Sequence, residues 1–111
     1  MVAIGFGLLI WSMLVNSYFS TAVRIQEDRG QRVISEGPYR VVRHPGYAGG
    51  VLVIFGSALA LNSLLALVPA VIFWLVLINR TAIEDRMLQG ELAGYADYAA
   101  KVRYRLIPGI W

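Results

Sequence analysis

Charge is confined to two short segments of this chain. All ten Lys and Arg and all seven Asp and Glu lie within 24–43 and 80–105. The stretches 2–23 and 45–79 contain no charged residue over 22 and 35 positions. A helix needs roughly 20 apolar residues to cross the hydrocarbon core of a bilayer. This segregation therefore predicts an integral membrane protein of the all-α class.

The composition agrees with a membrane protein and excludes several functions. Of the 111 residues, 58% are hydrophobic, and a chain of this length is expected to form one domain, 1–111. The net charge of +3 does not indicate a nucleic-acid partner, because the basic residues share their two segments with all the acidic ones. The chain has no cysteine and one histidine. Disulfides and thiolate metal sites are therefore excluded, and we expect no metal site.

The first uncharged stretch predicts a transmembrane helix over about 2–23. A signal peptide is the alternative, but the stretch lacks a basic start, and Ser20-Thr21-Ala22 is a poor cleavage site. Asn16 and Ser17 interrupt the apolar run near its charged end. We expect their side chains to form hydrogen bonds with a neighbouring helix.

The second uncharged stretch predicts a helical hairpin over about 46–61 and 64–89. Its 35 residues exceed one span but fall short of the roughly 40 that two full spans and a turn require, so short or tilted helices are expected. Ser63 is placed to cap the second helix, and Pro69 falls in its opening turns or kinks it. Small residues allow close helix packing or close approach of a cofactor. These residues are Gly46, Gly49, Gly50 and Gly56.

The two charged segments are expected on the cytoplasmic side, where the basic residues of membrane proteins concentrate. Residues 24–45 form the loop between the first helix and the hairpin. Residues 90–111 form an interfacial tail, with a short amphipathic helix and then an extended apolar end. The predicted architecture is thus polytopic, with one N-terminal transmembrane helix, a hairpin and a cytoplasmic tail. Three helices make a thin bundle, which a homo-oligomer or partner helices would complete.

The sole histidine lies where the first charged segment meets the hairpin, within Arg43-His44-Pro45-Gly46-Tyr47-Ala48-Gly49. A lone histidine at such a place is often bonded only to backbone. These seven residues, however, resemble the RHPxYxG signature of the isoprenylcysteine carboxyl methyltransferase family, to which phospholipid N-methyltransferases are related. Arg80–Leu88 resembles the second half of that signature, and the resemblance covers about 16–111. It implies an integral-membrane enzyme that uses S-adenosylmethionine.

The resemblance implies roles for particular residues. Arg80 would bind the acceptor's carboxylate and Glu84 the cofactor's ammonium group, and these two are the expected catalytic residues. Taken alone, they would be an i,i+4 surface ion pair of little energetic value. The family usually has Glu-Glu where this chain has Glu84-Asp85, so no role is carried over to Asp85. The expected cofactor-binding residues are Gln31, Val33, Ile34, Tyr39, His44, Pro45, Gly46, Tyr47 and Glu84, with Tyr39 as the partner of His44.

The tail admits two interpretations. Tyr95, Tyr98 and Tyr104 either close the cofactor pocket or form an interfacial aromatic belt. The resemblance also places Leu106-Ile107-Pro108 where the family's tail packs near the adenine site. Both interpretations put the tail beside the charged ends of the hairpin.

The residue inventory suits methyl transfer. Attack on a sulfonium methyl group releases a neutral thioether and needs no acid, and a carboxylate acceptor is already ionised at neutral pH. Such an enzyme needs mainly proximity and orientation. We therefore predict S-adenosylmethionine-dependent methylation of a lipophilic or prenylated carboxylate that enters from the membrane lipids. Three alternatives stay open: a phospholipid amine as acceptor, an NADPH-dependent reductase similar to sterol reductases in the tail 98–108, and a non-catalytic membrane scaffold.

Overall fold

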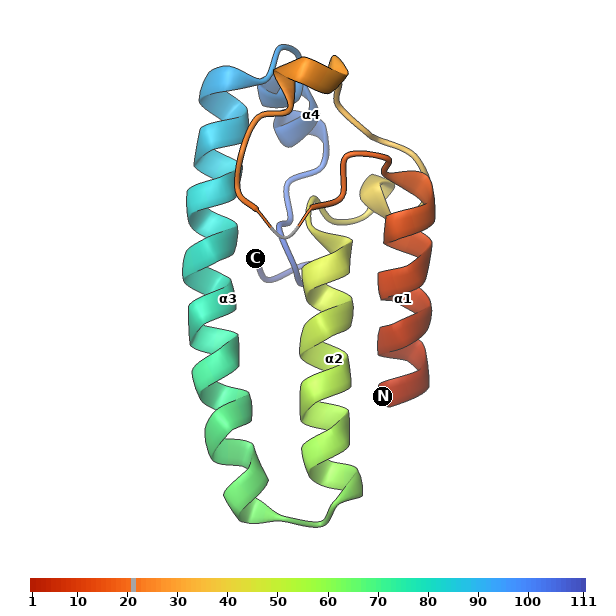
Figure 1. Ribbon diagram of the computed structural model, residues 1–111, viewed down its shortest axis with the longest axis vertical. Helices are drawn as coiled ribbons and strands as arrows, with labels where there is room; N and C mark the ends of the chain where they lie inside the picture. The colour runs from red at the N-terminus through yellow and green to blue at the C-terminus, as the bar shows by residue number, and fades with distance from the viewer. Residues whose placement is uncertain (21) are drawn as a thin grey trace.

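The computed structural model describes residues 1–20 and 22–111 and is built of helices (Figure 1). The described residues include no strand, so the predicted all-α class is confirmed. The α-helices are α1 (Val2–Val15), α2 (Pro45–Ala60), α3 (Leu64–Glu91) and α4 (Tyr95–Lys101), and the 3-10 turns η1 (Glu27–Arg29) and η2 (Gly37–Arg40) lie between α1 and α2.

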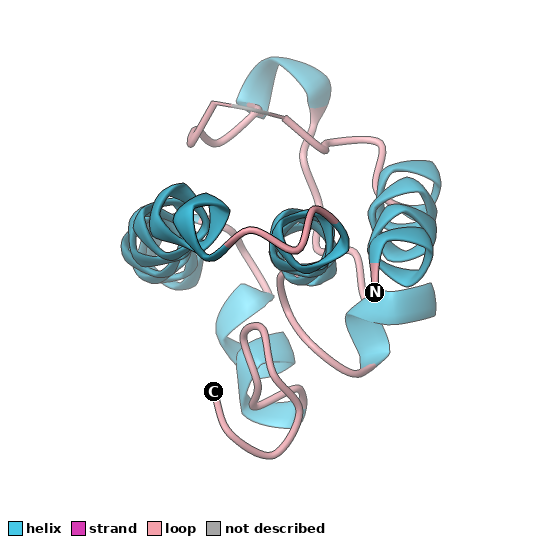
Figure 2. Cartoon of the chain, turned by 90° about the horizontal axis from the view of Figure 1, so that it is seen from below, coloured by secondary structure: helices cyan, strands magenta, loops and turns pink. Residues whose placement is uncertain are grey.

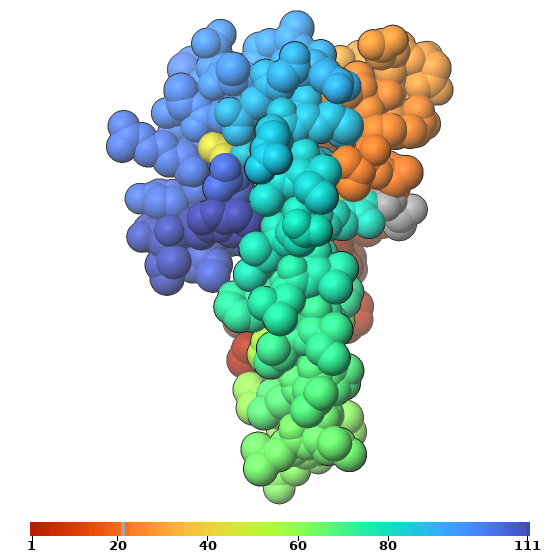
Figure 3. All heavy atoms as spheres, turned by 90° about the vertical axis from the view of Figure 1, so that its left-hand side faces the viewer, coloured from red at the N-terminus to blue at the C-terminus, as the bar shows by residue number. Residues whose placement is uncertain are grey.

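The three long helices stand side by side, with α2 between α1 and α3 (Figures 1 and 2). The end of α1, the start of α2 and the end of α3 meet at one end of this bundle, where α4 and the loop between α1 and α2 also lie. The hairpin turn lies at the opposite end. In the space-filling view the hairpin forms a narrow stalk below a broad head, which contains the loop after α1, the end of α3, α4 and the tail (Figure 3). Helix α1 lies beside α2, and we count it with the stalk. The two charged segments are therefore brought together in the head.

Helix α1 is shorter than the predicted 2–23, and this boundary was wrong. The helix ends at Val15, and Asn16 adopts an extended conformation. The Asn16 side chain accepts from Tyr18 N at 2.9 Å and donates to Tyr39 Oη at 3.1 Å. An asparagine that bonds locally to backbone offers the chain an alternative to the helix. The expected hydrogen bond from Asn16 is thus made to the loop, and residues after it pass into the head.

The predicted hairpin is confirmed with small shifts in its boundaries. It consists of Pro45–Ala60 and Leu64–Glu91 where 46–61 and 64–89 were expected. Ser63 caps α3 as predicted, because its side chain accepts a hydrogen bond from Ala66 N at 3.2 Å. Pro69 lies inside the opening turns of α3, and the helix continues without a break for 28 residues. The charged residues from Arg80 to Glu91 therefore belong to the same helix as the apolar part of the hairpin.

The outer faces of the stalk are apolar and exposed. They include Ile4 and Leu14 on α1 and Leu64, Leu65 and Val76 on α3. Helix α3 is the one described helix long and apolar enough to cross a membrane, whereas α1 and α2 are shorter apolar helices. Lipid tails are a suitable environment for a surface of this kind. The number of spans and the side that the head faces stay predictions.

Glycines allow α1 and α2 to approach closely. A Cβ atom on Gly49 would lie 2.7 Å from Gly5 O, and one on Gly5 would lie equally close to Gly49 O. Gly56 packs in the same way against Val2, with a Cβ-to-nitrogen distance of 3.0 Å. A Cβ on Gly50 would meet nothing within 4 Å. The predicted close packing is thus confirmed for Gly49 and Gly56 and wrong for Gly50.

The tail contains the predicted short helix but not the extended end. After α4 the chain folds back, and Trp111 O accepts hydrogen bonds from the backbone of Arg105 and Leu106. The Arg105 guanidinium also lies 4.9 Å from the centre of the Trp111 ring. A cation over an aromatic face is attractive, so the last residues close into a compact turn. Leu106 is buried.

We expect Gly49→Ala to destabilise the protein and Gly50→Ala to leave it unchanged or more stable. A methyl group at 49 meets Gly5 O at 2.7 Å and Leu9 N at 2.9 Å, so α1 must move away, at a cost of about 1–3 kcal/mol. A methyl group at 50 meets open space, and alanine is the better helix former by about 1 kcal/mol. Thermal unfolding in detergent, followed by circular dichroism, measures both midpoints. Equal midpoints would contradict this packing.

Candidate cofactor pocket

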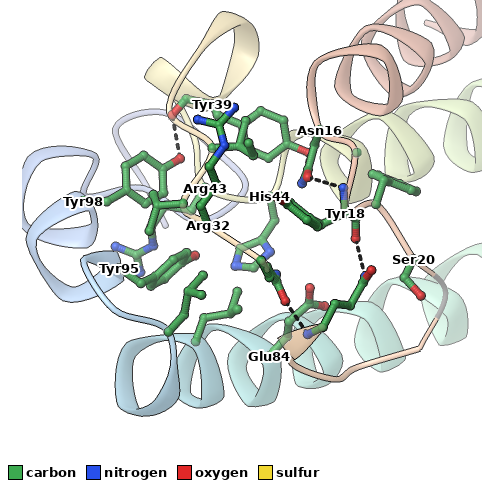
Figure 4. Close-up of a pocket in the computed structure, with 18 of the residues that line it drawn as sticks. Asn16, Tyr18, Ser20, Arg32, Tyr39, Arg43, His44, Glu84, Tyr95 and Tyr98 are labelled. Atoms are coloured by element: carbon green, nitrogen blue, oxygen red, sulfur yellow. Dashed lines mark hydrogen bonds between the residues drawn. The ribbon is translucent and has the colours of Figure 1, made fainter. Parts of the chain in front are cut away.

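A polar pocket lies in the head, between the loop after α1, the start of α2, the end of α3 and α4 (Figure 4). It encloses about 740 Å³, a volume that includes the open space at its mouth. His44 lies near its centre, between Tyr39 on one side and Glu84 on the other. The pocket therefore collects residues from segments that are far apart in sequence.

Eight of the nine expected cofactor residues line this pocket. The ninth, Pro45, is buried in the first turn of α2 and is not among the lining residues. A Cβ on Gly46 would lie 2.5 Å from the Phe19 ring, so this glycine lets a loop residue cover α2. That these residues bind a cofactor stays a prediction. The eight are Gln31, Val33, Ile34, Tyr39, His44, Gly46, Tyr47 and Glu84.

Tyr47 stands between Arg80 and Glu84. Its hydroxyl donates to Glu84 Oε2 at 2.5 Å and accepts from Arg80 Nε at 3.0 Å. The Arg80 guanidinium also lies 5.6 Å from the centre of the Tyr47 ring. Glu84 lines the pocket, whereas Arg80 is not among the lining residues. The two charges that were expected to act separately are thus joined by one phenol.

The most deeply buried charge of the site is Asp85, to which the sequence assigned no role. Its side chain is fully buried in α3, and both carboxylate oxygens are hydrogen-bonded. The donors come from the start of α2, from α3, from α4 and from the tail. The hydrogen bonds to Oδ1 come from Arg43 Nε (2.8 Å), His44 Nε2 (3.2 Å) and Tyr95 Oη (3.0 Å), and those to Oδ2 come from Arg43 Nη2 (2.7 Å), Gln89 Nε2 (2.8 Å) and Arg105 Nε (3.0 Å).

Asp85 and the five residues that donate to it form what we term the Asp85 network. Burying a carboxylate costs several kcal/mol unless opposite charges and hydrogen bonds compensate. Arg43 meets Asp85 through two parallel N–H donors, the strongest geometry for such a pair. Two signals in the sequence pointed here: Arg43 opens the first motif, and Asp85 occupies the second acidic position of the other.

Arg43 also fastens the tail to the pocket. Its Nη1 donates to the carbonyl oxygens of Ala99 and Val102 at 3.2 and 3.1 Å, where α4 ends. Two backbone bonds of 2.9 Å run beside it, from Arg43 N to Tyr104 O and from His44 N to Arg105 O. Helix ends leave carbonyl groups without internal partners, and this guanidinium satisfies them. The first motif and the tail thus form one unit.

The tyrosines divide into two groups. Tyr95 and Tyr98 are buried and line the pocket, which agrees with the interpretation that they close it. Tyr104 is exposed and lies outside the lining. Tyr98 Oη donates to Tyr39 O at 2.6 Å, as Figure 4 shows. Tyr39 was expected to be the partner of His44; among the described residues the His44 ring bonds to Asp85 instead, and the Tyr39 hydroxyl bonds to Asn16.

Burial raises the pKa of the Tyr95 phenol, and the negative charge and hydrogen bond of Asp85 raise it further. Burial is likewise the main reason that the pKa of Tyr98 is raised, with a further contribution from Tyr39. Both hydroxyl groups therefore stay protonated across the physiological range. They remain the hydrogen-bond donors that the site requires.

The fold and the pocket together define a small helical protein with an apolar stalk and a polar ligand pocket at one end. Residues 1–93 match the phospholipid methyltransferase family. The chain belongs to this family, and the prediction of the family is confirmed. Tyr95 and Arg105 of the Asp85 network lie beyond the matched residues.

Three relatives carry the name of one reaction. The protein is 28% identical to protein-S-isoprenylcysteine O-methyltransferase B of Arabidopsis thaliana over 86 residues, which are 76% of this chain and 44% of the relative. It is 30% identical to probable protein-S-isoprenylcysteine O-methyltransferases of Oryza sativa subspecies indica and japonica, over 76% of this chain and 45% of each relative. The chain thus spans less than half the length of the curated relatives it matches.

Stability should fall as the pH rises above about 10, the ordinary pKa of tyrosine. In the unfolded chain the tyrosines lose their protons there, whereas Tyr95 and Tyr98 in the folded protein keep theirs, because their pKa values are raised. The unfolded state then binds fewer protons, and each such tyrosine costs about 1.4 kcal/mol per pH unit. Chemical unfolding at several alkaline pH values measures how steeply the free energy of unfolding falls with pH. Tyr95→Phe should make this slope shallower, and an unchanged slope would show that Tyr95 ionises in the folded state.

Proposed function

We propose that this chain binds S-adenosylmethionine in the pocket and transfers its methyl group to the carboxylate of a lipophilic acceptor. The observation that carries the proposal is the meeting of both halves of the motif. Tyr47 and Glu84 are 37 positions apart and are joined by a hydrogen bond. They line one pocket at the end of an apolar bundle. A reaction between a polar cofactor and a membrane-dissolved acceptor needs such a boundary.

The residues present fit the cofactor. S-adenosylmethionine carries an ammonium group, a carboxylate, a sulfonium and a flat adenine ring. Glu84 provides a negative group for the cationic parts, and Arg32 provides a positive group for the carboxylate; both line the pocket. Val33, Ile34 and Leu88 provide apolar surface for a ring. When bound, the cofactor supplies an electrophilic methyl group and leaves as a neutral thioether.

The side chains of this protein have to orient the reactants rather than exchange protons with them. A carboxylate acceptor is ionised at neutral pH, so it needs no base. Arg80 is the proposed partner of that carboxylate, and Tyr47 connects it to Glu84 at the cofactor side. Correct placement of two reactants can supply several kcal/mol of the barrier reduction. In this proposal, Tyr47 keeps the acceptor site and the cofactor site in a fixed relation.

The apolar stalk supports a membrane location for the reaction. Helix α3 is long and apolar enough to cross a bilayer, and Arg80 follows directly after its uncharged part. An acceptor dissolved in lipid would reach Arg80 along this helix. The concentration of basic residues in the head supports the proposal that the pocket faces the cytoplasm.

A phospholipid amine is the second candidate acceptor, because the matched family is described by phospholipids. An ammonium group must lose its proton before it attacks. The pocket offers Glu84 as a group that could receive it, but Glu84 already accepts from Tyr47. A prenylated cysteine derivative and a phosphatidylethanolamine vesicle, supplied separately with labelled cofactor, distinguish the two acceptors.

Calorimetric titration with S-adenosylhomocysteine tests the cofactor assignment. The detergent-purified chain should bind it with micromolar affinity, and His44→Ala should abolish binding because His44 lies at the centre of the pocket. Arg86→Ala is the matched control, since Arg86 is exposed on α3 and does not line the pocket. Binding of NADPH in place of S-adenosylhomocysteine would assign the protein to the reductases. Binding of neither would favour a scaffold.

Arg80→Ala should lose methyl transfer, whereas Glu84→Gln should lose affinity for the cofactor. Arg80→Ala should lose methyl transfer to a prenylated cysteine derivative while it retains affinity for S-adenosylhomocysteine. Glu84→Gln should lose about tenfold or more of that affinity, because a hydrogen bond to a charged group contributes about 1.5–3 kcal/mol. Titration and single-turnover methyl transfer separate the two effects. An equal loss of cofactor binding in both variants would contradict this division of roles.

A further inference from the structure

We infer that Asp85 is a positioning residue, which holds His44 as the Nε2–H tautomer and leaves Nδ1 as a hydrogen-bond acceptor for the pocket's ligand. The inference begins with the hydrogen bond between His44 Nε2 and Asp85 Oδ1 at 3.2 Å. An ionised carboxylate can only accept hydrogen bonds. His44 Nε2 must therefore carry the proton in this contact. The other ring nitrogen is left to interact elsewhere.

The His44 ring also makes a stacking contact that favours one orientation of the ring. It stacks on the Tyr47 ring, with the ring centres 5.7 Å apart and an angle of 7° between the planes. The side chain does not cap α2, although His44 is the residue before that helix. Its Nδ1 has no hydrogen-bond partner among the described residues. Every buried side-chain nitrogen of those residues does have a partner, so Nδ1 is not a buried atom. Nδ1 therefore faces accessible space, and the accessible space beside His44 is the pocket.

Asp85 itself is not available to a ligand. Its side chain is fully buried, and its two oxygens already receive six donors. A carboxylate offers about four lone-pair sites, so the group is saturated. Asp85 can influence the pocket only through the groups that it holds. Of these, His44 lies at the centre of the pocket.

The chemistry of the remaining nitrogen defines what it recognises. A neutral imidazole with its proton on Nε2 presents Nδ1 as an acceptor. It would take an N–H donor of the ligand and would be unsuited to a carboxylate or a phosphate. This step rests on the proposed function, in which the ligand is S-adenosylmethionine. That molecule offers N–H donors on its ammonium group and on its adenine amino group.

The substitution Asp85→Asn gives a sharp test, because an amide has one acceptor and one donor end. At Oδ2 the amide would face two donors that cannot accept a hydrogen bond, Arg43 Nη2 and Arg105 Nε, beside Gln89, whose own amide can turn. At Oδ1 it would face only one such donor, Arg43 Nε, beside His44 and Tyr95, which can both accept. The amide should therefore turn its NH₂ group toward His44. His44 should respond by moving its proton to Nδ1.

Because His44 is the sole histidine, its tautomer can be read without assignment. The full chain, labelled with ¹⁵N-histidine in detergent, is measured by long-range ¹H–¹⁵N correlation at a pH at which the imidazole is neutral. The wild-type protein should show the Nε2–H pattern. Asp85→Asn should show the Nδ1–H pattern and bind S-adenosylhomocysteine about tenfold or more weakly. Gln89→Met, which removes one donor from Oδ2 and lies outside the pocket lining, should keep the wild-type pattern.

The outcomes separate this inference from the proposed function. An Nδ1–H pattern in the wild-type protein would overturn the positioning role, whether or not Asp85→Asn folds. An unchanged tautomer in a folded Asp85→Asn would overturn it as well. Wild-type protein that shows the Nε2–H pattern but does not bind S-adenosylhomocysteine would support the role of Asp85 and contradict the assignment of the cofactor. A changed tautomer together with weakened binding supports both.

Discussion

The head of this protein depends on one buried carboxylate. Asp85 is fully buried on α3, and its donors come from the start of α2, from α4 and from the tail. Taking such a group out of water costs several kcal/mol, so the fold is stable only when these segments arrive together. Removal of one partner leaves the others facing an uncompensated charge. The segments that make the pocket are therefore held by a mutual electrostatic requirement, beside the apolar cluster of Tyr39, Leu88, Tyr95 and Tyr98.

The stalk is stabilised by a different interaction. Helices α1 and α2 approach until backbone atoms nearly touch at Gly5 and Gly49, and most large apolar side chains of the stalk point outward. In lipid no hydrophobic force drives helices together, and close packing at small residues takes its place. The stalk is thus held by close helix packing, and the head is held by the hydrogen bonds and ion pairs of Asp85. The pocket lies where they meet, since α3 passes from one to the other as a single helix.

Local features were predictable from the sequence, and contacts across long separations were not. The hairpin, the Ser63 cap and the close approach at Gly49 follow from composition within a few residues. The end of α1 was missed because Asn16 bonds to Tyr39, 23 positions away. The folded-back tail and the role of Asp85 depend on Arg105, which no local pattern connects to either. The resemblance supplied the pocket residues, but it carried no role to Asp85, because this chain has an aspartate where the family usually has a second glutamate.

Glu84 and Asp85 are adjacent acids on one helix, but Glu84 lines the pocket and Asp85 is fully buried. Successive residues of an α-helix point about 100° apart, so one side chain reaches the pocket and the other the interior. Glu84 receives one hydrogen bond among the described residues, from Tyr47, and it keeps acceptor capacity for a cationic ligand. Asp85 receives six and keeps none. In the proposed function Glu84 binds the cofactor, while Asp85 holds the surrounding residues and meets Arg43 at 2.8 and 2.7 Å.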